Sequence, residues 1–198
     1  MNTFESEGKL NRALEFLPDD ETLSERKLDK KGLTRPELSV LISYVKGDLK
    51  QTLIDSTLPD DPMLAGEMYK VFPRDLTQKF SKELGEHQLR REIIATQIAN
   101  DMVNHMGITF VERLSQSTGA DAATIALAWL IARDVFRIDC WWDKIEDLDF
   151  HIPAQLQIEL MGDLMRLMRR SVQWLLRNRR AELSIEGHME RFADSVWA

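Results

Sequence analysis

Residues 121–133 read Asp-Ala-Ala-Thr-Ile-Ala-Leu-Ala-Trp-Leu-Ile-Ala-Arg, the most apolar segment of the chain. Asp121 is a residue that caps helix N-termini well, and no further charge follows until Arg133. A helix that is apolar on every side is stable in water only when other elements cover it. We therefore expect residues 122–132 to form a buried central helix around which the rest of the chain packs.

The segments on both sides of this stretch carry apolar residues at helical spacing. Thr34 and Glu37 have the spacing of a capping box and mark the start of one helix. Gly107 ends another helix, and Pro153 begins the longest one. Helices are predicted over residues 10–17, 20–31 (capped by Asp20), 34–56, 64–72, 73–85, 86–106, 108–117, 138–148, 153–178 and 185–196.

The composition agrees with a helical chain. Leucine occurs 26 times and valine only 8 times, and glycine and proline together make 15 of 198 residues. Straight-chain apolar residues favour helix, whereas β-branched residues favour strand. No alternating strand pattern of useful length is present. The sequence predicts an all-α, irregular bundle of roughly eight to ten helices. We expect one helical domain over residues 1–198, in which residues 1–32 could form a short lead-in.

Charge and cysteine content narrow the classes of function. The formal net charge is −7, which disfavours wholesale binding to nucleic acid, because such binding depends on neutralising phosphates. No run of about 18 apolar residues is present, so no membrane partner is expected. The first residues carry acids and no apolar stretch, so no signal peptide is expected there. A lone cysteine, Cys140, allows no internal disulfide and indicates a reducing, cytoplasmic compartment.

The common catalytic and cofactor motifs are absent from the sequence. No two of the nine glycines are closer than twelve residues, which excludes the glycine-rich loops that hold dinucleotides and phosphates. The four histidines never pair at i, i+4, so no metal site is predicted. We expect Cys140 to be a packed free thiol. The acidic residues after it look like a solvated helix face: Asp139, Asp143, Glu146, Asp147 and Asp149.

The sharpest chemical feature is a basic stretch near the C-terminus. Six arginines occur between Leu164 and Ala181 with no acid among them. It could bind nucleic acid, bind an acidic metabolite or another domain, or pair with the acidic segment 139–149. The last two are favoured, and the exclusive use of arginine favours a protein interface, because guanidinium groups pair with carboxylates in a bidentate way. The candidate interface residues are Arg166, Arg170, Gln173, Trp174, Arg177 and Arg180.

Six blocks of the sequence resemble the large bacterial NAD-specific glutamate dehydrogenases, in the same order. Together they extend from about Gly8 to Phe192. The blocks are Arg12–Pro18, Gly32–Leu41, Leu58–Pro62, Leu89–Asn100, Ile131–Phe136 and Trp174–Arg180.

The resemblance implies that the chain is the start of the helical C-terminal region of such an enzyme. The parent reaction would be oxidative deamination of L-glutamate to 2-oxoglutarate and ammonia with NAD. The family's catalytic residues and cofactor loop belong to its central core, and none matches a position here, so no catalytic residue and no cofactor are assigned to this chain. The expected partners are the dehydrogenase core and neighbouring subunits of an oligomer. The alternative is a free-standing helical adaptor that binds nucleic acid or an acidic partner.

Overall fold

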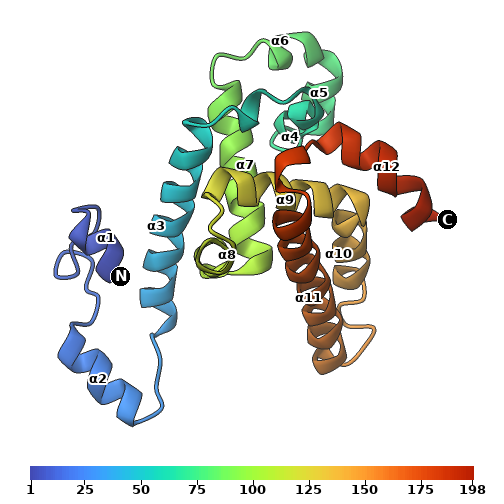
Figure 1. Ribbon diagram of the computed structural model, residues 1–198. Helices are drawn as coiled ribbons and strands as arrows, with labels where there is room; N and C mark the ends of the chain where they lie inside the picture. The colour runs from blue at the N-terminus through green and yellow to red at the C-terminus, as the bar shows by residue number, and fades with distance from the viewer. The chain divides into compact units, whose positions relative to one another are not determined.

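The structure is a computed structural model that describes residues 1–198, and it contains helices and turns but no β-strand (Figure 1). The predicted all-α fold is confirmed. Eight of the twelve α-helices have nine or more residues, and the other four have only five or six. The helices are α1 (Asn2–Ser6), α2 (Asp20–Leu28), α3 (Arg35–Ile54), α4 (Ala65–Tyr69), α5 (Arg74–Lys79), α6 (Ser81–Gly85), α7 (Arg90–Met106), α8 (Phe110–Thr118), α9 (Ala122–Val135), α10 (Ile138–Glu146), α11 (Ala154–Asn178) and α12 (Ile185–Trp197).

The chain divides into two compact units, Met1–Asp48 and Leu49–Ala198, and the boundary falls within α3. Each unit has its own buried apolar residues. The expectation of one domain with a lead-in over residues 1–32 stays a prediction.

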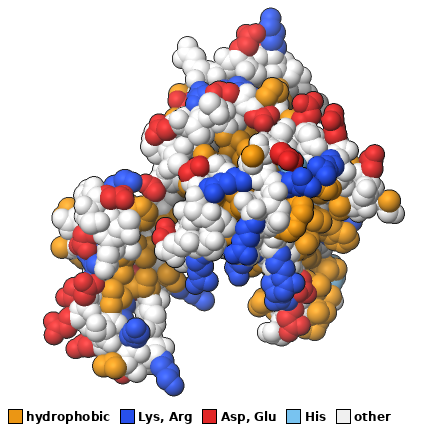
Figure 2. All heavy atoms as spheres, viewed as in Figure 1, with side chains coloured by type: hydrophobic (Ala, Val, Ile, Leu, Met, Phe, Trp, Pro, Cys, Tyr) orange, Lys and Arg blue, Asp and Glu red, His pale blue; other side chains and the backbone are white.

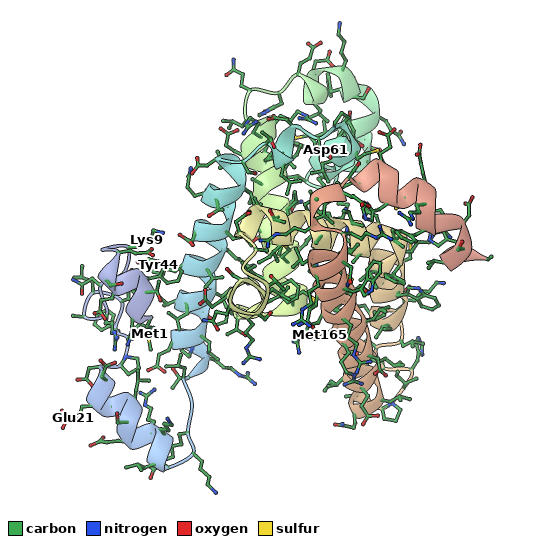
Figure 3. All side chains as sticks on the ribbon, viewed as in Figure 1. Met1, Lys9, Glu21, Tyr44, Asp61 and Met165 are labelled. Atoms are coloured by element: carbon green, nitrogen blue, oxygen red, sulfur yellow. The ribbon has the colours of Figure 1, made fainter.

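The first unit has a small core built around Leu10, Leu17 and Leu41. Tyr44 of α3, labelled in Figure 3, packs against this core, and its hydroxyl donates a hydrogen bond of 2.6 Å to Oε1 of Glu15. The unit is therefore held by a few apolar side chains and by polar contacts around them.

The predicted helix over residues 10–17 is wrong, because this segment forms turns. Leu14 and Phe16 are exposed, and Phe16 has a positive φ of 53°. The buried guanidinium of Arg12 binds Asp20 at 2.8 Å and Asn2 at 2.6 Å, so it draws neighbouring segments to this turn. An eight-residue helix is marginal in water, and these tertiary contacts override its apolar pattern.

The start of α2 also differs from the prediction. Asp19 caps the helix by accepting a 2.8 Å hydrogen bond from the backbone N–H of Thr22. The predicted cap, Asp20, instead gives its carboxylate to Arg12.

The capping box at the start of α3 is half formed. The Glu37 carboxylate accepts a 2.6 Å hydrogen bond from the backbone N–H of Thr34 and binds Arg26 at 2.8 Å. The Arg26 guanidinium, together with the Thr34 N–H, lowers the pKa of Glu37 from 4.5 to about 2. Glu37 therefore fixes α2 against the first turn of α3.

The second unit is organised around α9, as predicted. Asp121 caps this helix by accepting a 2.8 Å hydrogen bond from the N–H of Thr124. Nine of the fourteen residues of α9 are buried. The helix lies amid α7, α8, α10, α11 and α12 (Figure 1).

Several predicted helix boundaries in this unit are confirmed. Gly107 ends α7 and Gly119 ends α8, both with positive φ, and Pro153 precedes α11. The predicted helix over residues 73–85 is wrong in one respect, because it splits into α5 and α6 at Phe80. There φ is −123° and the helical path is interrupted.

A buried ion pair joins α9 to its neighbours. The Arg133 side chain is only 5% exposed, and its guanidinium lies 2.8 Å from Glu67 of α4, which is equally buried, and 2.8 Å from Asp134. Lys70 then bridges Glu67 and Asp139, each at 3.1 Å, which brings the start of α10 into the network. The charged end of the apolar helix is thus neutralised inside the unit.

We expect Arg133→Met to lower the free energy of unfolding by about 3 kcal/mol, because it leaves Glu67 buried with one cation fewer. The double variant Arg133→Met/Glu67→Leu should recover part of that loss. The control Arg166→Met removes an exposed ion pair with Asp163 and should change stability by less than about 0.5 kcal/mol. Denaturant unfolding measures all three, and equal losses for Arg133→Met and Arg166→Met would contradict a stabilising role for the buried pair.

We also expect Glu37→Gln to lower the thermal unfolding temperature in a pH-dependent way. A folded-state pKa of about 2 against an ordinary 4.5 means that ionised Glu37 stabilises the fold above pH 4.5, and this contribution disappears as the pH falls toward 2. The difference between wild type and variant should therefore be largest above pH 4.5 and small near pH 2. Circular dichroism melts test this, with the exposed Glu25→Gln on α2 as a control. A difference that stays constant with pH would contradict it.

Candidate functional site

An apolar groove of about 430 Å³ lies between α9, α11 and α12. Side chains of all three helices line it: Ile131, Ala132, Val135, Phe136, Arg170, Ser171, Trp174, Leu175, Phe192 and Val196. Hydrophobic side chains gather over α11 and beneath α12, next to basic side chains (Figure 2). Its volume and its mostly apolar lining make this groove a candidate binding site, since binding sites are concave and mostly apolar with a few polar groups.

Contacts at the end of α12 frame this groove. The indole N–H of Trp197 donates a 2.8 Å hydrogen bond to the backbone carbonyl of Val135. The guanidinium of Arg137 lies 3.6 Å from the centre of the Trp197 ring, which is the distance of a stacked cation–π contact. The last turn of α12 is therefore fixed beside the end of α9, and Val196 reaches the groove.

Five of the six predicted interface residues share one face of α11. Arg166, Arg170, Gln173, Trp174 and Arg177 follow one another at i, i+4, i+7, i+8 and i+11, which places them on the same side of a helix. Of these, Arg170 and Trp174 line the groove. We call the five residues the α11 face.

Arg180, the sixth candidate interface residue, does not belong to this face, so grouping it with the other five is wrong. It follows the end of α11, and its guanidinium donates to the carbonyls of Thr118 and Gly119 at 3.2 and 2.6 Å. These are backbone carbonyls at the end of α8, so Arg180 stabilises that helix terminus. The sequence could not show this contact, because the partners lie about sixty residues apart.

The arginines of α11 do not pair with the acidic segment 139–149, so that alternative is also wrong. Arg166 pairs with Asp163 on its own helix, and Asp139 pairs with Lys70. Arg170 and Arg177 are exposed and have no ion-pair partner. Two uncompensated cations therefore lie on the α11 face, on both sides of the half-exposed Trp174 in sequence.

The groove also contains residues that the sequence did not identify as a site. In the sequence, Phe192 and Val196 belong to the apolar stripe of the last predicted helix. In the structure, Val196 is 42% exposed and Phe192 is half-buried. Nothing in the sequence marked Phe136 or the adjacent Arg137 as part of a site, because their role depends on the approach of α12 to the end of α9.

A second group of titratable side chains surrounds Arg133. Burial disfavours its charge, but the carboxylates of Asp134 and Glu67 outweigh that effect and raise the pKa of Arg133. Burial raises the pKa of Asp101 on α7, which lies near the same charges. The charged groups in this cluster neutralise one another, and what they do is hold α4, α9 and α10 together.

The remaining candidate groups are scattered. Cys140 is exposed, so the prediction of a packed thiol is wrong; α10 buries Ile138, Trp142 and Ile145 instead. His188 is buried, with Nδ1 2.9 Å from the carbonyl of Ser184. No group of three or more His, Cys, Asp or Glu side chains is placed to hold a metal ion. None of the helices combines the length and the apolar character needed to cross a bilayer.

The family model and the similar proteins that match this chain agree on one family. Residues 30–198 match the family model described as glutamate dehydrogenase, C-terminal. The chain is 52% identical over its whole length to an NAD-specific glutamate dehydrogenase of Pseudomonas aeruginosa and 51% identical over 90% of its length to that of Halomonas elongata. It is 33% identical over 98% of its length to that of Mycobacterium tuberculosis. The chain spans only 11–12% of the length of these relatives.

Proposed function

The chain belongs to the glutamate dehydrogenase C-terminal family, and from this premise we propose that it is a non-catalytic helical part of a larger NAD-specific glutamate dehydrogenase. In the parent enzyme, the reaction would be oxidative deamination of L-glutamate to 2-oxoglutarate and ammonia, with NAD as the oxidant. The enzyme would act in the cytoplasm as an oligomer, and NAD would bind outside residues 1–198.

Two features of the chain support a non-catalytic role. The glycines are too far apart to form the loop that holds a dinucleotide pyrophosphate. The buried charges around Arg133 are engaged with one another across α4, α9 and α10, which is the arrangement of a structural network. The chain therefore contributes packing surface to the enzyme.

The α11 face is the surface that docks on the dehydrogenase core or on a neighbouring subunit. One observation carries this assignment: Arg170 and Arg177 are unpaired cations beside the half-exposed Trp174. Arginine and tryptophan are the residue types that dominate protein interfaces. Nothing observed favours the alternative of a nucleic-acid-binding adaptor.

We expect the variant Arg170→Glu/Arg177→Glu of the full-length enzyme to dissociate or to oxidise glutamate about tenfold more slowly. The new carboxylates would repel the acidic groups that the two unpaired arginines would bind on the partner surface. NADH absorbance gives the rate and analytical ultracentrifugation gives the assembly state.

The matched control for this experiment is Arg74→Glu/Arg113→Glu. It makes the same change in net charge at exposed arginines of α5 and α8, and should leave rate and assembly unchanged. Equal behaviour of the two double variants would refute docking through the α11 face.

A further inference from the structure

We propose that the groove between α9, α11 and α12 holds an acidic amphipathic helix that comes from another part of the same polypeptide. This inference rests on the proposed function, because it requires a longer chain. It goes further by naming the chemistry of the segment that docks and the pocket that receives it.

The apolar character of the groove requires an apolar partner. Trp174 and Val196 line it and are 48% and 42% exposed, and the neighbouring Trp197 is 40% exposed. Aromatic and aliphatic side chains gathered in one concave surface are typical of an interaction site. Their burial is favourable by about 25 cal/mol for each Å² removed from water. Apolar side chains of a partner are therefore the groups that this groove takes.

The charges at the groove select an acidic partner. Arg170 lines the groove and has no carboxylate partner, and Arg137 is adjacent to Phe136 and stacked on Trp197. No Asp or Glu side chain lines the groove. Asp134, which directly precedes the lining residue Val135, is bound to Arg133. A carboxylate on the incoming segment would complement Arg170.

The walls of the groove favour a helix as the docked segment. Three helices form it, and a groove between helices receives an amphipathic helix through residues spaced i, i+3, i+4 and i+7. Such a helix would place apolar residues against Trp174 and Phe192 and a Glu or Asp beside Arg170.

The size of the groove favours a tethered segment over a second copy of the chain. Ten residues line it, whereas a stable interface between two proteins uses roughly 20–30 residues on each side. A segment joined to the same polypeptide binds intramolecularly, and a short flexible tether gives it an effective concentration of about mM, so a small groove is enough to hold it. The chain spans 12% of the length of its Pseudomonas aeruginosa relative, so a longer polypeptide of this kind has ample sequence to supply the segment.

Hydroxyl-radical footprinting of the unmodified full-length polypeptide tests whether the groove is occupied. Trp174 and Trp141 are almost equally exposed, at 48% and 51%, but only Trp174 lines the groove. We expect oxidation of Trp174 to be at least about fivefold slower than that of Trp141, since a docked helix excludes solvent. Equal oxidation of the two tryptophans would show an open groove and overturn the proposal.

Photo-crosslinking then identifies the occupant. Benzoylphenylalanine is placed at Val196, and the control position is Ile158, which is exposed on α11 and does not line the groove. We expect crosslinks from Val196 to an acidic amphipathic segment of the same chain, and their loss in Arg170→Glu. A mixture of isotopically labelled and unlabelled polypeptide separates contacts within one chain from contacts between copies.

The remaining outcomes test the occupied groove and docking through the α11 face separately. Crosslinks to a second copy, to a different protein or to no protein at all would overturn the occupied groove. A charge-reversed enzyme that loses activity while wild-type Trp174 reacts like Trp141 would leave the proposed function standing and refute the occupied groove. Full activity and assembly after charge reversal, together with a protected Trp174, would refute docking through the α11 face and leave the occupied groove standing.

Discussion

The burial of α9 on nearly every side is the constraint on which the second unit depends. A helix with no charged residue before its last turn has no polar face to offer to water, so it must be surrounded. Five neighbouring helices meet this requirement, with α11 and α12 as its main partners. The chain turns from α8 into this helix at Gly119, which has a left-handed conformation, and Asp121 caps the start of the helix.

The last turns of α9 combine two different environments. Arg133 points to one side, where Glu67 and Asp134 neutralise it away from water. Ile131 and Val135 lie on the opposite side of the same turns and form part of the groove. A buried ion pair contributes little net stability compared with apolar packing, but its loss leaves the remaining charge buried. Loss of Arg133 would therefore disturb the same turns that form the groove wall.

The groove and the α11 face fit the proposed role of the chain, in which it contributes a docking surface to a larger enzyme. The family relation assigns the chain to a C-terminal region, and its relatives are about eight times longer. A rigid surface loses little conformational entropy when it binds a partner. In the proposed function, the α11 face and the adjoining groove would provide such a surface, with both cationic and aromatic groups.

The fold class, the family and most helix boundaries of the second unit could be predicted from the amino-acid sequence. These features follow from local rules: apolar spacing, the cap at Asp121, the stops at Gly107 and Gly119, and the break at Pro153. The sequence also selected the α11 face, because residues on one side of a long helix are set by spacing alone. It failed at residues 10–17, where the contacts of a buried arginine, Arg12, override a short apolar pattern.

Which arginines have no ion-pair partner, and where the groove lies, follow from the packing of the helices and could not be predicted from the sequence. Arg180 looks like its neighbours in sequence, yet it binds carbonyls about sixty residues away, whereas Arg170 finds no partner. The groove requires Trp197 to reach Val135, a contact over a similar separation. Such contacts depend on how helices cross in space, and a local pattern of residues carries no information about that crossing.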